Sequence, residues 1–459
     1  MNNIYHVIKD PVHGTMQFTS VEDKWVKPFI DSPNFQRLRQ IKQLGLGDFI
    51  FPGAVHSRFN HCLGCCYLGG QIAQKIGLAD EERQLVLIAC LLHDIGHGPF
   101  SHAFEWIFQR TLIKHEDWTP YFLADYSTKE FFTSYNAINP RYHLTDEKFQ
   151  HIADMIMHRP ITKRVLADIV SSQLDADRLD YLLRDSHFCG VRYGEFDFRW
   201  MLHCLAIVPS QKGERLGVTH KGIGVVEHYL MARRLMTRNI YHAQKKLALE
   251  VLLIRLLAEL AENIAYYSSL EGVLHTRLGQ FLMAVNQFNQ GIDQASDLEA
   301  YKQHFLKQYY SIYRELCDDD IFSLIKKLAI MHDPHPAVQI ALRLSQRNMP
   351  KILRLEQLDL LHSEQELQEF KSKYTEYADW QLLFIQTPHQ SYSGEDPILV
   401  INEHGLVQPI DTYSMMIHAI SDKLEETAFL AIDKGIVEDK PVIALMDRLS
   451  RKVKHHEIN

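Results

Sequence analysis

The sequence predicts a mainly helical protein with a small mixed α/β region at its C-terminal end, and two patterns indicate this fold class. In the first two-thirds of the chain, apolar residues recur at helical spacing; in "QLVLIACLLHDIGH", Leu85, Ile88 and Leu92 lie on one stripe. Later, "WQLLFIQT" and "PILVIN" are short and rich in strand-forming residues. We therefore expect a helical body over residues 1–349 and a small α/β region over residues 350–459.

The expected helices start near residue 61. The segment 61–76 has a helical apolar period, and its Gly69 and Gly70 indicate a close crossing with another helix. "ITKRVLADIVSSQLDADRLDYLLRDS" predicts two helices around a break near residues 173–176. An apolar-periodic stretch then runs over residues 222–266, with at most a soft break. Further helices are expected near residues 273–289, 300–316, 321–332 and 336–346.

In the C-terminal region the residue pattern changes from helical spacing to short strand, turn and loop signals. "NEHG", from Asn402 to Gly405, predicts a turn after the strand "PILVIN". "SYSGEDP", residues 391–397, predicts a loop because it is rich in turn-forming residues. Another helix is expected over residues 412–425.

Composition bounds the function. The chain has 49 basic and 57 acidic residues, a formal net charge of -8, so nucleic acid is not expected as its main ligand, although a local basic pocket stays open. No apolar stretch is long enough for a membrane span, so no membrane partner is expected. "MNNIYHVIKD" lacks the basic start and apolar core of a secretory signal.

The cysteines indicate a reducing compartment. Seven cysteines, irregularly spaced, do not suit a disulfide framework, so we expect a cytoplasmic location. Cys62, Cys65 and Cys66 would share one helix face. A zinc or redox CxxC is one interpretation, but there is no second CxxC, and core packing is favoured.

The segment "LLHDIGHGPFSH" suggests a metal site. His93 and Asp94 stand where a buried helix ends, and an imidazole and a carboxylate at a helix end can point at one cation. Further ligands must come from elsewhere. The candidates are His56 and His61 in "HSRFNHCLG", and Asp175, Asp177, Asp180 and Asp185 in "LDADRLDYLLRD". A solvated amphipathic face is the alternative for the acids.

Four blocks in order resemble the HD-domain deoxynucleoside triphosphate triphosphohydrolases, which include the mammalian SAM-and-HD-domain enzyme and bacterial single-chain relatives. The blocks are "DSPNFQRLRQIKQLG", "FPGAVHSRFNHCLGCCYLGG", "LLHDIGHGPFSHAFE" and "DADRLDYLLRDS". The resemblance implies a helical HD-domain metal phosphohydrolase core with its site within about residues 31–245. It implies one divalent ion, Mn, Fe, Mg or Zn, bound by His61, His93, Asp94 and Asp177. His56 would have a structural or substrate-side role.

The resemblance also implies a reaction. Water would attack the α-phosphorus of a dNTP and release the deoxynucleoside and inorganic triphosphate. His102 would be the general acid at the 5′-oxygen, oriented by Glu105 one helical turn away. His97 and His115 would contact the phosphates.

Substrate-binding residues follow from the same resemblance. Arg58, Arg178 and Arg233 would bind phosphates. Tyr181 and Asp185 would contact the deoxyribose and its 3′-OH, with Gln43 as a second 3′-OH partner, and Tyr241 would lie on the base or sugar side. "YHAQK" departs from the family order, so the base preference stays open. For Arg234, Lys245 and Lys246, an exposed basic helix face is favoured.

A regulatory nucleotide site is implied by Asp31, Gln36 and Arg39. A capped helix start, with Asp31 or Ser32 at the cap and Pro33 in the first turn, explains the same residues, and both can hold. We expect a homo-oligomer, a tetramer or dimer of dimers, activated by GTP or a second dNTP.

Competing functions stay open at this point. An HD-domain nucleoside monophosphate phosphatase or cyclic-nucleotide phosphodiesterase would use the same metal site. A non-catalytic nucleotide sensor would keep the fold without turnover. An HD oxygenase with a di-iron site would need extra ligands, such as His56, His97 or His115.

Overall fold

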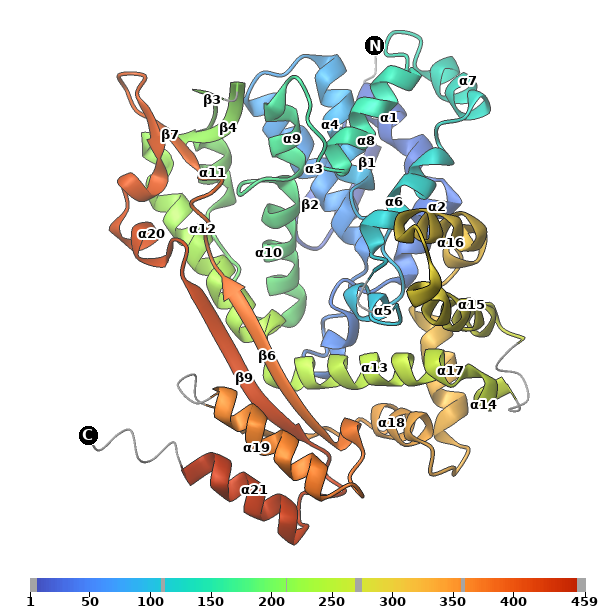
Figure 1. Cartoon of the computed structure of the whole chain (residues 1–459). Helices are drawn as coiled ribbons and strands as arrows, with labels where there is room; N and C mark the ends of the chain where they lie inside the picture. The colour runs from blue at the N-terminus through green and yellow to red at the C-terminus, as the bar shows by residue number, and fades with distance from the viewer. Residues whose placement is uncertain (1–5, 109–111, 212, 269–274, 356–359, 452–459) are drawn as a thin grey trace.

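The computed structural model describes residues 6–108, 112–211, 213–268, 275–355 and 360–451. Its architecture is mainly helical with three small sheets, which confirms the predicted fold class (Figure 1). Among the described residues, no helix combines the length and apolar character that a membrane crossing needs. The helices of the N-terminal half are α1 (Ser20–Ile30), α2 (Pro33–Gln36), η1 (Arg37–Gln40), η2 (Gly45–Phe49), α3 (Arg58–Lys75), α4 (Asp80–Leu92), α5 (His102–Glu105), α6 (His115–Ala124), α7 (Lys129–Ile138), α8 (Asp146–Ile156), α9 (Arg164–Val170), α10 (Ala176–Cys189) and α11 (Phe198–Cys204).

Helices α3, α4 and α10 pack together and form the centre that positions the site. The glycines of α3 permit the predicted close crossing, since a Cβ on Gly69 would lie 2.7 Å from the sulfur of Cys90 on α4. Helix α10 starts at a side-chain cap, in which Asp175 accepts a hydrogen bond from the backbone N–H of Arg178, and it ends at Gly190 with a left-handed φ of 69°. The predicted break near residues 173–176 is therefore the gap between α9 and α10.

The second half continues the helical body. The stretch predicted over residues 222–266 divides at a π-helical turn, which carries Tyr241 between α12 and α13. Such turns occur often at functional sites. The expected helix near residues 273–289 begins in residues outside the described part of the chain. The elements are η4 (His220–Gly222), α12 (Ile223–Met236), η5 (Thr237–Tyr241), α13 (Gln244–Glu262), α14 (Ile264–Ser268), α15 (Arg277–Gly291), η6 (Ile292–Gln294), α16 (Leu298–Tyr313), α17 (Asp318–Ala329) and α18 (Pro336–Ser345).

Three antiparallel or mixed sheets complete the fold. The first is the hairpin of β1 (His6–Asp10) and β2 (Gly14–Phe18), and the second has the order β3-β4-β7-β8. The third has the order β5-β9-β6, and in Figure 1 its two long strands, β6 and β9, cross the molecule beside α12 and α13. The remaining bounds are β3 (Leu205–Ser210), β4 (Gly213–Thr219), β5 (Lys351–Arg354), α19 (Leu360–Lys373), η8 (Asp379–Gln381), β6 (Leu382–Gln390), β7 (Leu399–Ile401), β8 (Val407–Pro409), η9 (Ile410–Thr412), α20 (Met415–Ile420), β9 (Leu424–Ile432) and α21 (Lys440–Arg451).

One element predicted from the sequence is wrong in part. The helix expected over residues 412–425 is confined to α20, and Leu424 already begins strand β9. Residues 424–432 pair along their length with β5 and β6, and these long-range ladder contacts outweigh the local helical pattern.

Candidate active site

Four side chains converge from three segments, as the metal prediction requires. His61 comes from α3, His93 and Asp94 from the end of α4, and Asp177 from the first turn of α10. His61 Nε2 lies 3.0 Å from Asp177 Oδ1 and 3.8 Å from Asp94 Oδ2. His93 Nε2 lies 3.6 Å from Asp94 Oδ1 and 3.7 Å from Asp177 Oδ1. Two imidazole nitrogens and two carboxylates therefore face one point.

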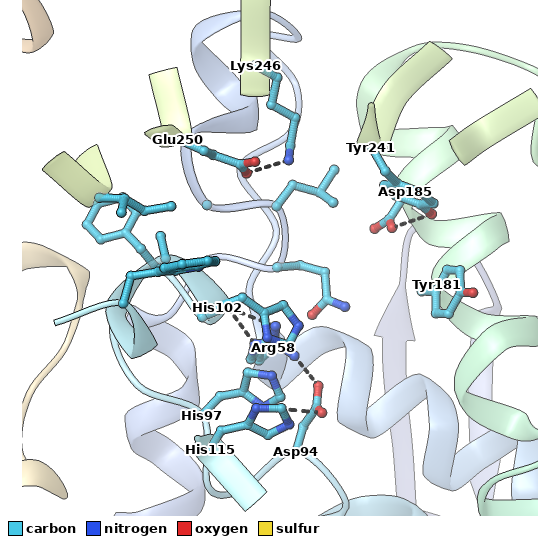
Figure 2. Close-up of a pocket in the computed structure, with 18 of the residues that line it drawn as sticks. Arg58, Asp94, His97, His102, His115, Tyr181, Asp185, Tyr241, Lys246 and Glu250 are labelled. Carbon is cyan, nitrogen blue, oxygen red and sulfur yellow. Dashed lines mark hydrogen bonds and ion pairs between the residues drawn. The ribbon is translucent and has the colours of Figure 1, made fainter. Parts of the chain in front are cut away.

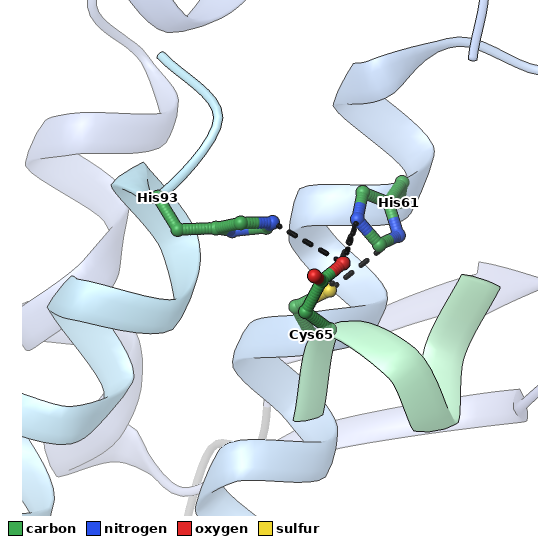
Figure 3. Close-up of side chains that lie close together, drawn as sticks. His61, Cys65 and His93 are labelled. Atoms are coloured by element: carbon green, nitrogen blue, oxygen red, sulfur yellow. Dashed lines mark hydrogen bonds and ion pairs between the residues drawn. The ribbon is translucent and has the colours of Figure 1, made fainter. Parts of the chain in front are cut away.

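His61 and His93 point into one space beside Cys65 (Figure 3), and hydrogen bonds on the far side of each imidazole fix this orientation. His61 Nδ1 donates to Asp180 Oδ2 at 2.8 Å, and His93 Nδ1 donates to the Cys90 carbonyl at 2.9 Å. Both Nε2 atoms are then left for the centre of the cluster. His93 Nε2 is buried and has no hydrogen-bond partner within the described part of the chain.

The electrostatics of the cluster favour a cation. Burial would raise the pKa of Asp94, but Arg58 and His93 hold it well below its usual range. Burial would likewise raise the pKa of Asp177, but hydrogen bonding to His61 and the charge of His93 hold it low. Burial would lower the pKa of His61, yet Asp177 and Asp180 outweigh it and raise the pKa to about 10. The same negative field that favours a proton on His61 favours a divalent ion.

The donor set fits a single divalent metal. Imidazole and carboxylate ligands together suit Mn, Fe or Zn, and carboxylates suit Mg. Cys65 lies beside them, with its sulfur 3.5 Å from His61 Nε2. Without a metal, burial raises the pKa of the Cys65 thiol well above its ordinary value. Cys62, Cys65 and Cys66 are all buried and free, as core packing predicts.

Asp180 supports the cluster from behind, a role that the sequence did not reveal. Its carboxylate accepts hydrogen bonds from His61, from His13 Nε2 at 2.6 Å, and from Arg184 Nε and Nη2 at 2.8 and 3.0 Å. Arg184 also donates to Asp10 at 2.8 Å. Asp180 lies one helical turn after Asp177, so the spacing alone could have placed it near the cluster. Nothing in the sequence around His13 indicates its contact with Asp180.

A pocket of about 580 Å³ opens beside the cluster and brings together most of the predicted site residues (Figure 2). Asp94 and Asp177 belong to both the cluster and the pocket wall. The other predicted residues that line the pocket are Gln43, Arg58, His97, His102, His115, Tyr181, Asp185 and Tyr241.

Three histidines form one end of this pocket, and Glu105 contacts two of them. The rings of His97 and His115 stack with their centroids 3.7 Å apart. Glu105 Oε1 accepts hydrogen bonds from His115 Nδ1 at 2.7 Å and from His102 Nδ1 at 3.3 Å. Burial would raise the pKa of Glu105, but these hydrogen bonds lower it to about 2. Glu105 is therefore a carboxylate that orients two histidines.

Arg58 links the histidine end to the metal cluster. Its Nη1 donates to Asp94, and its Nε and Nη2 donate to Ser101 Oγ at 2.9 and 2.7 Å. Ser101 and the preceding Phe100 have left-handed φ values of 55° and 51°, which are costly for such residues. A strained turn at this point, anchored by Arg58, sets the start of α5 and so the place of His102.

Asp185 is held from both sides at the middle of the pocket. His56 Nε2 donates to Asp185 Oδ1 at 2.7 Å, and the Tyr241 hydroxyl donates to Oδ2 at 2.8 Å. The His56 ring stacks on Phe188, with centroids 4.5 Å apart. His56 thus touches a predicted substrate residue and lies outside the cluster of His61, His93, Asp94 and Asp177.

The structure does not bring Arg178 and Arg233 into the pocket wall as described. Arg178 Nη1 donates to Asp175 Oδ2 at 3.2 Å, and Arg233 Nη1 donates to Gln173 Oε1 at 3.2 Å. Burial raises the pKa of the Tyr181 phenol, and the charges of these two arginines oppose that rise.

The three residues of the suggested regulatory site lie near the start of α2. Asp31 is exposed and pairs with Lys27 Nζ at 3.1 Å. Gln36 Oε1 accepts from Arg39 Nε at 2.7 Å, and the Arg39 guanidinium lies over the Phe59 ring. Ser32 is the helix cap.

The sequence interpretation of Lys246 is wrong. An exposed basic face was favoured for this residue, but Lys246 is buried, lines the pocket and donates to Glu250 Oε1. Its neighbour Lys245 is exposed, as expected. Periodicity would have placed Lys246 in the apolar stripe of α13 with Leu249 and Leu253, a signal that its charge obscured.

Comparisons with known proteins agree with this geometry. A family model described as "HD domain" matches residues 58–185. The uncharacterized protein YwfO of Bacillus subtilis is 37% identical over 257 residues, covering 55% of this chain and 55% of that protein. Human deoxynucleoside triphosphate triphosphohydrolase SAMHD1 is 32% identical over 264 residues, covering 51% of this chain and 41% of that protein. The chain thus spans about half the length of the curated relatives it matches.

Solved structures cover more of the chain. A phosphohydrolase from Bacteroides thetaiotaomicron has a TM-score of 0.71 at 27% identity, covering 94% of this chain and 100% of that chain. A hypothetical protein from Aquifex aeolicus has a TM-score of 0.70 at 23% identity, covering 96% and 100%, which shows the fold alone. The family match begins at Arg58 and ends at Asp185, so it spans all four residues of the cluster. This chain therefore contains an HD domain, built around His61, His93, Asp94 and Asp177.

Proposed function

We propose that this protein is a metal-dependent phosphohydrolase that converts a dNTP to its deoxynucleoside and inorganic triphosphate. One observation carries the proposal: a single pocket joins the two metal-facing aspartates, Asp94 and Asp177, to a histidine end and to the Tyr181–Asp185 wall. The relatives named as dNTP triphosphohydrolases support the substrate class.

His61, His93, Asp94 and Asp177 would hold one Mn, Fe, Mg or Zn ion. Such an ion polarises phosphoryl oxygens and makes water a better nucleophile. Asp180 and the Cys90 carbonyl keep the two imidazoles in the ligating tautomer, and this outer shell raises their basicity.

His102 is the proposed general acid. Glu105 accepts from its Nδ1, which leaves Nε2 to carry the proton to the leaving 5′-oxygen. The side chain of His102 is 70% exposed, so it faces the open pocket rather than the core. His97, His115 and Arg58 would bind phosphate oxygens; His97 Nδ1 is buried and has no hydrogen-bond partner among the described residues.

Asp185 would accept the 3′-OH of the deoxyribose. His56 and Tyr241 hold its two oxygens, and Gln43 brings a second polar group whose Oε1 is buried without a partner in the described chain. The Tyr181 ring would exclude a ribose 2′-OH by its size.

Arg178 and Arg233 remain proposed cations for the far end of the triphosphate. Reaching it requires each guanidinium to exchange its present partner, Asp175 or Gln173, for phosphate oxygens. Bidentate binding to phosphate would compensate for those exchanged bonds.

Product analysis tests the reaction. Purified protein is incubated with each dNTP and Mn²⁺ or Mg²⁺, singly and in pairs, and the products are resolved by ion-pair chromatography. We expect deoxynucleoside and intact triphosphate, lost in His102→Ala and kept in the exposed control His143→Ala. Three outcomes would contradict the proposal. Stepwise phosphate loss, or turnover of monophosphates alone, would favour a phosphatase, and turnover of cyclic nucleotides alone would favour a phosphodiesterase. No turnover by a metal-loaded chain would favour a nucleotide sensor.

We also propose that the protein is a homo-oligomer, a tetramer or dimer of dimers, with Asp31, Gln36 and Arg39 binding a regulatory GTP or dNTP. The exposed Asp31 can accept from a guanine edge, and the exposed Arg39, in η1, carries a positive charge eight residues along the chain. Light scattering with and without GTP, alongside activity, is the test. A chain that stays monomeric and is indifferent to added nucleotide would contradict this part.

A further inference from the structure

Lys246 and Glu250 form a charged pair in the pocket, at the end opposite to His97, His115 and Asp94 (Figure 2). They lie one turn apart on α13, and Lys246 Nζ donates to Glu250 Oε1. The Lys246 side chain is only 8% exposed, whereas that of Glu250 is 25% exposed. Both side chains line the pocket, and the carboxylate is the more exposed member of the pair.

The surroundings of this pair are apolar. Leu44, Gly45 and Ile254 line the same pocket without hydrogen-bonding side chains. Gly45 has a left-handed φ of 53°, and a Cβ at this position would lie 3.8 Å from Glu250 Oε1. A larger side chain at Gly45 would cover the carboxylate. Because a buried ion pair adds little stability over apolar packing, recognition of a ligand explains this placement better.

The order of groups along the pocket indicates which part of a nucleotide reaches the pair. The histidine end suits the phosphates, and Asp185 with Tyr241 suits the sugar. Lys246 and Glu250 lie in the same pocket at the end away from the phosphate-facing histidines, where the base would extend (Figure 2). Resting on the proposed function, we infer that Lys246 and Glu250 read the base and that they select guanine.

Hydrogen-bond chemistry gives this preference. Glu250 Oε1 is engaged by Lys246, and Oε2 has no hydrogen bond to the described residues. The guanine edge presents two adjacent donors, N1–H and the N2 amino group, next to the O6 acceptor. A carboxylate can accept from both donors while the ammonium group donates to O6. Thymine offers one N–H between two carbonyl oxygens, so one carboxylate oxygen would face an acceptor.

Steady-state kinetics with dGTP, dITP and dTTP tests the assignment. The wild type should favour dGTP over dTTP by roughly tenfold or more in kcat/KM, and dITP, which lacks the N2 amino group, should fall between them. Glu250→Gln should abolish this preference by lowering kcat/KM for dGTP, with little change in kcat/KM for dTTP. Lys245→Ala, which removes an exposed positive charge one residue from Lys246, should behave as the wild type.

Equal kcat/KM values for dGTP and dTTP in the wild type, or an unchanged preference in Glu250→Gln, would overturn the inference. If Glu250→Gln does not fold, the wild-type ratio of kcat/KM for dGTP to kcat/KM for dITP decides, because only a base contact through the N2 amino group makes this ratio exceed one. If the wild type hydrolyses no dNTP, the proposed function fails separately, and calorimetric binding decides the pocket's role. Tighter binding of dGTP than dTTP would then support base selection, and equal binding would refute it.

Discussion

At the scale of single residues, His56 shows how a buried side chain can act on substrate through another. It is fully buried beside Asp185, and its Nδ1 has no partner among the described residues, so Nε2 is the ring nitrogen that donates to Asp185. Asp185 is thereby held in a fixed orientation.

His56→Ala should therefore raise the KM for a dNTP by roughly tenfold, because Asp185 loses one of its two anchoring donors. A 2′,3′-dideoxynucleotide, which lacks the 3′-OH, should be affected much less. His56→Gln, whose amide nitrogen can replace Nε2, should restore the wild-type KM. Equal losses for both nucleotides would show a general structural defect rather than positioning of Asp185.

Gly64 permits the contact between Asp180 and the metal cluster. A Cβ at this position would lie 1.8 Å from Asp180 Oδ1 and 2.5 Å from Arg184 Nη2. Gly64→Ala should therefore destabilise the fold by about 1–3 kcal/mol and weaken metal binding, despite the better helix propensity of alanine.

Gly70→Ala on the same helix is the matched control, since its Cβ would meet only Leu87 at 3.4 Å. Thermal unfolding and metal titration of both variants provide the measurement. A Gly64→Ala variant as stable and as tightly metal-bound as Gly70→Ala would contradict the role of this contact.

Some of these residue roles could be predicted from the sequence, and others could not. The block pattern predicts His61, His93, Asp94 and Asp177 as metal ligands because they fall in three local motifs, and the structure brings these four side chains together. The contact of His61 with Asp180 joins residues 119 positions apart, and no local pattern reports it. The charge of Lys246 predicts exposure, but its spacing places it in the apolar stripe of α13, and the structure follows the spacing.

At the scale of elements, the first residue of α17 fastens two pocket segments together. Asp318 accepts hydrogen bonds from the backbone N–H groups of Lys42, at 2.9 Å, and Phe100, at 2.7 Å. These segments carry Gln43 on one side and Ser101 on the other. The placement of the strained turn before α5 thus depends on a helix more than two hundred residues away.

Asp318 should give a measurable pH dependence of stability. Burial raises the pKa of Asp318 from 3.8 to about 6, so between these pH values the folded chain binds more protons than the unfolded chain. Stability from this group is therefore present at low pH and is lost as the pH rises through about 6. Asp318→Asn should remove about 1 kcal/mol of the difference in unfolding free energy between pH 5 and pH 7.

Urea unfolding of wild type, Asp318→Asn and the exposed neighbour control Asp319→Asn measures this difference. The control should keep the wild-type pH dependence. A pH dependence equally unchanged in Asp318→Asn would contradict the assignment.

Long periodic elements were the ones that the sequence predicted well. Helices α3, α4, α9 and α10 were expected from apolar period and from cap or break signals. The hairpins β1–β2 and β3–β4 were not expected, since strands of five to seven residues carry little periodicity. The first residues of β9 were expected to be helical, because the strands that pair with it, β5 and β6, are distant in sequence.

At the scale of the whole molecule, the two proposed regions, residues 1–349 and 350–459, share packing. Val218 of β4 pairs in parallel with Val400 of β7. Arg215 Nη2 donates to Asp396 at 3.1 Å, and the largest buried cluster includes Trp380. The division at residue 349 stays a prediction.

Removal of residues 350–459 should therefore lower the melting temperature or prevent folding, because β4 would lose its parallel neighbour and apolar core would be exposed. Circular dichroism melting of the 1–349 fragment against the full chain is the measurement. A fragment that melts at the temperature of the full chain would show instead that residues 1–349 fold on their own.

The central claim is that three distant segments meet to hold one divalent ion. The most direct test is the metal content of purified, Mn²⁺-reconstituted chain by plasma mass spectrometry, for wild type and for Asp177→Asn, with His56→Gln as control. One ion per chain is expected in wild type and control, and a large loss in Asp177→Asn. No bound ion or two ions per chain in the wild type, or full retention in Asp177→Asn, would contradict this claim.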